Sequence, residues 1–132
     1  MLRRFINLFI GLAMFAPLVA SALPIECQCV LALRTFRGVN IRGDASTIKA
    51  NWPLNEVGTG DVLLLQYGKV SHTALVIDKE VEVIDENPYI TRTISVLVEE
   101  WNYVSCERSV REIMITDSHI RGVYKTLTIP AL

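Results

Sequence analysis

The stretch Glu26-Cys27-Gln28-Cys29-Val30-Leu31-Ala32-Leu33-Arg34 contains two of the three cysteines in this 132-residue chain. Apolar residues within and just after it recur at the three-to-four spacing of one helix face, which predicts a short helix over 29–37. Gly38 follows as a C-terminal stop signal. A thiol at a helix N-terminus lies in a positive local potential that favours the thiolate, the nucleophilic form of cysteine. Cys29 is therefore a candidate nucleophile.

The segment that precedes this stretch has the features of a secretory signal peptide. Arg3 and Arg4 come before an apolar run over 5–20, and Ala20-Ser21-Ala22 offers the small residues that a signal peptidase requires. The apolar run is shorter than the roughly 20 residues that a membrane span needs. Residues 1–22 are expected to be removed, with an uncleaved membrane anchor as the alternative. Residues 23–132 are then expected to form one catalytic domain, secreted or periplasmic.

Composition narrows the range of partners. The net charge is −1 and the chain has no basic runs, so it offers no electrostatic footprint for nucleic acid. Hydrophobic residues make up 51% of the chain and charged residues 20%, as in a globular domain. We expect no nucleic-acid partner, and no stable membrane contact once the leader is removed.

The cysteine count has a consequence of its own. An exported chain meets an oxidising environment, where cysteines tend to form disulfides. Of three cysteines, two can pair, and the third remains as a candidate reactive thiol. Cys27 and Cys29 are too close in sequence to bridge without strain, so either could pair with Cys106. The pairing that we predict is Cys27–Cys106, with Cys29 free; three free thiols are the alternative.

The pattern changes from helical to strand-like after Asp61. Continuous or alternating apolar runs predict strands over 62–67, 72–77, 81–85, 94–98, 111–115 and 123–127, with a bend at 78–80. A second short helix is predicted to start at Asp44 or Ser46 and to end at Ala50. Helices followed by strands imply an α+β fold, with short N-terminal helices packed on an antiparallel sheet.

The predicted hairpin brings polar residues to one face of the sheet. A bend centred at 79–80 places His72 opposite Asn87, with Asp85 on the same face. A three-residue bend would bring Glu86 opposite His72 instead, so Glu86 is the rival third residue.

These residues suit thiol catalysis. Cys29 would attack a carbonyl, His72 would transfer the proton, and Asp85 or Asn87 would orient the imidazole. Gln28 and the Cys29 backbone N–H are candidate donors to the oxyanion. Each residue alone has a plainer explanation, since a lone cysteine is usually a small buried hydrophobe.

A metal site is the weaker interpretation of the same residues. A zinc set would need Cys27, Cys29, His72 and Asp85, but Cys-x-Cys is not the usual ligand spacing. We therefore expect neither a metal nor another cofactor. His119 lies in a polar turn and is expected at the surface.

In their order along the chain, several short motifs resemble the CHAP family of cysteine amidohydrolases and peptidases, within the NlpC-type papain-like superfamily. The matching stretches are Gln28-Cys29-Val30 with Arg34, Ala50-Asn51-Trp52, Gly60-Asp61-Val62, Ser71-His72-Thr73-Ala74-Leu75-Val76, Val83-Ile84-Asp85-Glu86-Asn87 and Ile120-Arg121-Gly122-Val123-Tyr124.

The resemblance implies a papain-like fold, with Cys29 and His72 as catalytic residues. The family's Glu and Asn, separated by one residue, fall on Asp85 and Asn87, so an Asp replaces the Glu. It also implies cleavage of an amide bond in the peptide part of bacterial peptidoglycan, by an amidase or endopeptidase that forms an acyl-enzyme. The alternatives are an amide hydrolase with a protein or other substrate, and a non-catalytic binding module.

Overall fold

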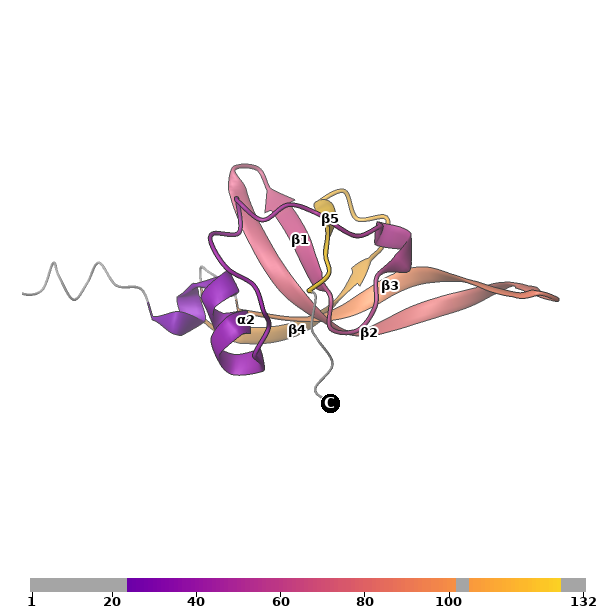
Figure 1. Cartoon of the computed structure of the whole chain (residues 1–132), viewed down its shortest axis with the longest axis horizontal. Coiled ribbons are helices and arrows are strands. Elements are labelled where there is room, and N and C mark those ends of the chain that lie inside the picture. Colours follow the sequence, from indigo (N-terminus) through magenta and orange to yellow (C-terminus); the bar gives the residue numbers. More distant parts are fainter. Residues whose placement is uncertain (1–23, 102–104, 127–132) are drawn as a thin grey trace, which may run out of the picture.

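The computed structural model describes residues 24–101 and 105–126, so the expected leader over 1–22 lies outside the described residues. The described chain is an α+β structure in which one short N-terminal helix packs on a five-stranded antiparallel sheet (Figure 1). Its elements are η1 (Ile25–Cys27), α2 (Cys29–Arg37), η2 (Leu54–Glu56), β1 (Val62–Tyr67), β2 (Val70–Glu86), β3 (Tyr89–Trp101), β4 (Arg108–Met114) and β5 (Ile120–Tyr124).

The helix α2 has the bounds that its sequence predicts. Gly38 ends it in the left-handed conformation, with φ of 64°, and its N–H bonds to the last-turn carbonyls. The apolar face of α2 buries Val30 and Leu33 against one face of the sheet, where Leu64 and Leu75 form part of the same core. This packing fixes the start of the helix, and with it Cys29, beside β2.

The sheet has the strand order β4-β3-β2-β1-β5, and all its pairs are antiparallel. A second core, which includes Leu63, Val76 and Val98, lies on the face opposite α2. The strand β1 matches its prediction, whereas β5 begins at Ile120 and ends at Tyr124, earlier than the predicted 123–127; residue 127 lies outside the described part.

The predicted bend at 78–80 is wrong. The strand β2 is continuous over 17 residues, and the hairpin turns at Asn87-Pro88. Three register shifts accommodate irregular residues without breaking the pairing, so Asp78, Lys79 and Glu80 pair with β3. The pairing of β2 with β1 ends at Leu75. The end of the β2–β3 hairpin, residues 79–94, projects from the rest of the domain as a two-stranded arm (Figure 1).

The predicted second helix is also wrong, because residues 44–50 form only a single turn. The Thr47 N–H bonds to the Asp44 carbonyl, and the Arg121 guanidinium donates to the carbonyls of Ala45 and Ile48. Those carbonyls therefore have a partner from β5, which satisfies them without a helix.

A disulfide joins Cys27 to Cys106, the pairing expected from the sequence. It links the turn before α2 to the connection between β3 and β4. Cys29 keeps a free thiol.

Candidate active site

Cys29 is the first residue of α2, and its half-buried thiol faces β2. Burial raises the pKa of this thiol, but interactions with His72 and Thr73 outweigh that effect and lower the pKa below its ordinary value. The Thr73 hydroxyl is buried near the sulfur but completes no regular hydrogen bond within the described chain, so we assign most of the lowering to His72. The thiolate is therefore favoured at the N-terminus of this helix.

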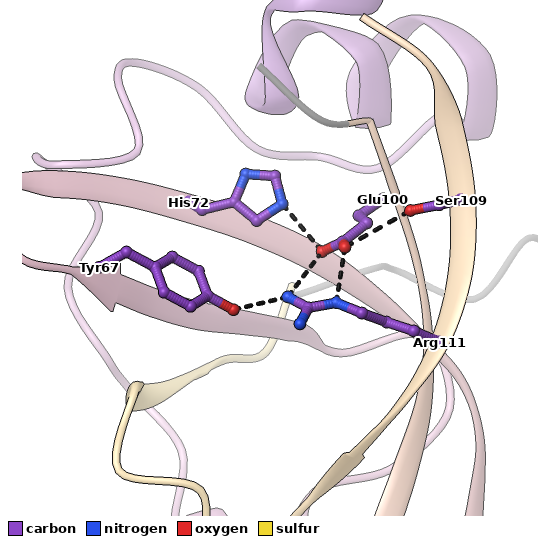
Figure 2. A network of polar contacts seen from close by, with 5 residues as sticks. All are labelled: Tyr67, His72, Glu100, Ser109 and Arg111. Atoms are coloured by element: carbon purple, nitrogen blue, oxygen red, sulfur yellow. Dashed lines mark hydrogen bonds and ion pairs between the residues drawn. The ribbon is translucent and has the colours of Figure 1, made fainter. Parts of the chain in front are cut away.

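His72 lies in β2 opposite Leu65, and its side chain is almost fully buried. Its Nε2 is 2.9 Å from Oε2 of Glu100 (Figure 2). We therefore assign the hydrogen bond between His72 and Cys29 to the other ring nitrogen, Nδ1. Burial lowers the pKa of His72, but hydrogen bonds and charges from Cys29 and Glu100 raise it to about 9. The two pKa shifts have opposite directions, down for Cys29 and up for His72, and both favour a thiolate beside an imidazolium.

Glu100 supplies the third polar group, and its side chain is 5% exposed. Continuing the register from the pair Leu75–Glu99 by one residue places it on the His72 face of the sheet. Burial raises the pKa of Glu100, but the hydrogen bonds with His72 and Arg111 and their charges lower it more, so it is ionised. A buried carboxylate on Nε2 fixes the ring orientation and stabilises the imidazolium, which is the role expected of an orienting acid.

Asp85, Asn87 and Glu86, the residues predicted for this role, lie elsewhere. All three are exposed at the tip of the arm, and Asp85 pairs with Ile90 while Glu86 pairs with Tyr89. Asp85 lies thirteen positions after His72 along β2, which is about 40 Å of extended strand at roughly 3.3 Å per residue. The prediction failed because the hairpin closes at Asn87-Pro88 rather than at 79–80, which changes every cross-strand neighbour of His72.

Gln28 and Cys29 occupy the place expected of oxyanion donors. Gln28 is the residue before α2, and its carbonyl accepts the Ala32 N–H at 2.8 Å. The Cys29 N–H belongs to the first turn of the helix, whose N–H groups have no intrahelical acceptor. Their role as oxyanion donors stays a prediction.

Glu99, the neighbour of Glu100, lies on the face of the sheet that α2 covers, and it anchors this helix, which carries Cys29. Its carboxylate accepts two bonds from Arg37 at the end of α2, at 2.5 and 2.8 Å, and one from Arg108 of β4 at 2.6 Å. Phe36 stacks on Trp101 beside this contact, with ring centroids 5.3 Å apart. The two adjacent carboxylates thus divide two tasks: Glu99 ties α2 to the sheet, and Glu100 orients His72.

The zinc set considered from the sequence is not assembled. Cys27 is in the disulfide and Asp85 is on the arm, and the described residues contain no group of three or more side chains suited to hold a metal ion. His119 is exposed, as predicted, and its ring contacts Tyr67 at a centroid distance of 4.6 Å. None of the helices in the described part is long and apolar enough to cross a membrane.

Comparison of the chain with family models, curated proteins and solved structures gave no match. The interpretation of the site therefore depends on its own geometry.

Proposed function

We propose that this chain is an exported cysteine hydrolase with a papain-like, CHAP-type architecture, which cleaves amide bonds in the peptide part of bacterial peptidoglycan. The observation that carries this proposal is the buried series Cys29–His72–Glu100, in which a thiol at a helix N-terminus meets an imidazole held by a carboxylate. A thiolate, a protonated general acid and an orienting group are what amide hydrolysis by a cysteine requires.

The first half of the reaction forms a thioester. The Cys29 thiolate attacks the carbonyl carbon, a C–S bond forms, and the carbonyl electron pair moves to oxygen as an oxyanion. Backbone N–H groups at the start of α2 would donate to that oxyanion. The C–N bond then breaks as His72 gives its proton to the leaving amine, which departs neutral.

The second half restores the enzyme. The now neutral His72 takes a proton from water, and the resulting hydroxide attacks the thioester carbonyl. The C–S bond breaks, the carboxylic acid product leaves, and the thiolate–imidazolium pair is regenerated. Glu100 stays ionised throughout, because it stabilises the imidazolium without accepting its proton.

Two features support peptidoglycan as the substrate. The chain resembles the CHAP family around Cys29 and His72, and the family's usual substrate is the peptide part of the wall. The leader expected over 1–22 would deliver the enzyme to the compartment where that substrate lies, and the Cys27–Cys106 disulfide suits an oxidising space.

A protein substrate for the same chemistry is the second candidate, and the arm favours it. Val83, Ile84, Tyr89 and Ile90 are 46–70% exposed there, a concentration of apolar side chains that a protein surface could cover. A non-catalytic binding module has less support, because such a module has no use for a thiol whose pKa is lowered by a buried imidazolium.

The substrate prediction is tested with protein exported from a host cell, so that the disulfide forms, and incubated with purified peptidoglycan. We expect soluble fragments that carry new amino and carboxyl termini, whose masses identify the bond that is cut. Protein blocked at Cys29 with iodoacetamide is the matched control and should release none. If unblocked protein also releases none while its Cys29 is still rapidly alkylated, peptidoglycan is the wrong substrate and the protein candidate takes its place.

A further inference from the structure

Arg111 of β4 forms hydrogen bonds with two residues beside His72, Glu100 and Tyr67. Its Nε is 2.6 Å from Oε1 of Glu100, and its Nη2 is 3.3 Å from Oε2 of the same carboxylate (Figure 2). The Nη2 also donates to the Tyr67 hydroxyl at 2.6 Å, and the guanidinium carbon lies 5.9 Å from the centroid of that ring. The guanidinium is thus fixed at both ends, by β3 and by β1.

We infer that Arg111, itself held by Tyr67, is a positioning residue that locks the Glu100 carboxylate in the orientation that binds His72. Both oxygens of Glu100 are occupied by one planar group, so the carboxylate cannot rotate away from Nε2 without breaking two charged hydrogen bonds. The inference rests on the proposed catalytic pair but not on any particular substrate.

The groups that surround His72 and Glu100 come from every neighbouring element. Cys29 comes from α2, Tyr67 from β1 and Arg111 from β4, while the Ser109 hydroxyl of β4 lies 3.5 Å from Oε1 of Glu100. Asp117 lies close enough for the charge of Arg111 to lower its pKa. Among these groups, Arg111 is the one that joins Glu100 to a second strand through a bidentate contact.

Two possible roles for Arg111 predict opposite results. If it acts only as a positive charge near His72, its removal should make the imidazolium more stable and raise the pKa of His72. If it acts as a clamp, its removal should free Glu100 to turn away from His72. The pKa of His72 should then fall, because burial lowers this pKa and the carboxylate no longer opposes that effect. The direction in which the pKa of His72 changes therefore shows whether Arg111 acts as a clamp or only as a positive charge.

The experiment is an NMR titration of the imidazole resonances in the intact oxidised chain, which has only two histidines, His72 and His119. The wild-type midpoint for His72 is expected near 9. In Arg111→Met we expect it to fall by about one pH unit or more, a tenfold change in proton affinity. Arg111→Lys keeps the charge but not the bidentate contact, and should shift the midpoint in the same direction.

Arg108→Met is the matched control, because Arg108 lies in the same strand but binds Glu99. It should leave the His72 midpoint unchanged. An upward shift in Arg111→Met, no shift, or an equal shift in Arg108→Met would overturn the inference. If Arg111→Met does not fold, the same titration is made on Tyr67→Phe, which keeps the aromatic ring but removes the hydroxyl that holds the guanidinium. We expect the His72 midpoint to fall by less than in Arg111→Met. An unchanged midpoint would contradict the clamp.

Discussion

Replacing Cys29 by alanine should abolish amide hydrolysis, with kcat/KM for fragment release reduced by about 10⁴-fold or more. The thiolate forms the covalent bond, and no second thiol can take its place because Cys27 and Cys106 are joined in the disulfide. The release of peptidoglycan fragments, followed by mass spectrometry, measures this effect.

The stability of the Cys29→Ala variant is expected to change little, by about 1 kcal/mol at most, since the side chain is small and only partly buried. Thermal unfolding of the oxidised protein checks this point, and so separates a chemical loss from a folding defect. A folded Cys29→Ala protein that releases fragments at the wild-type rate would show that another residue is the nucleophile.

Replacing Glu100 by glutamine should lower kcat by about 10²–10³-fold while KM changes little. The amide keeps the shape of the side chain but removes the charge that stabilises the imidazolium, which acts in the chemical step rather than in ground-state binding. The loss of charged hydrogen bonds from His72 and Arg111 should also cost on the order of 2 kcal/mol of stability. Steady-state kinetics and thermal unfolding measure the two effects separately.

Asp85→Asn is the matched control for this substitution, because it removes the same charge at the exposed tip of the arm. Its kcat and stability should match those of the wild type. The assignment of Glu100 would be wrong if Asp85→Asn lost activity and Glu100→Gln kept it.

The features that depend on local sequence could be predicted. The bounds of α2 follow from its apolar spacing and from Gly38, and β1 follows from an apolar run between turn residues. His72 could be singled out as the partner of Cys29 because it begins a predicted apolar strand, whereas the second histidine, His119, lies in a polar turn. These inferences required no knowledge of which residues pair across the sheet.

The third member of the site could not be predicted in the same way. Asp78-Lys79-Glu80 has the polarity of a bend, yet in the structure it continues a ladder, because pairing with Leu97, Val96 and Ser95 of β3 satisfies its backbone. The true turn, Asn87-Pro88, carries its own signal in the sequence. Choosing between the two turns sets the register, and only the register brings Glu100 to His72.

The burial of Glu99 and Glu100 is a second feature that could not be predicted from local sequence. Two adjacent acids after an apolar run suggest the exposed end of a strand, because buried carboxylates need partners. Here the partners are Arg37 of α2, 62 residues from Glu99, and two arginines of the next strand, β4, Arg108 and Arg111, which lie 9 and 11 residues from the glutamates that they bind. A pair of acids beside Trp101 was the available signal, but its meaning depended on contacts that no local pattern reveals.

The claim that Cys29 rests as a thiolate beside a protonated His72 is tested most directly by the rate of Cys29 alkylation with iodoacetamide as a function of pH. The thiolate is the reacting form, so the midpoint of the rate profile reports the pKa of Cys29. In the oxidised wild-type protein we predict a midpoint well below that of the same thiol in urea-unfolded protein. In His72→Gln the midpoint should rise, because burial then acts without its counter-charge. A folded wild-type protein with the same midpoint as the unfolded chain would contradict the proposed catalytic pair.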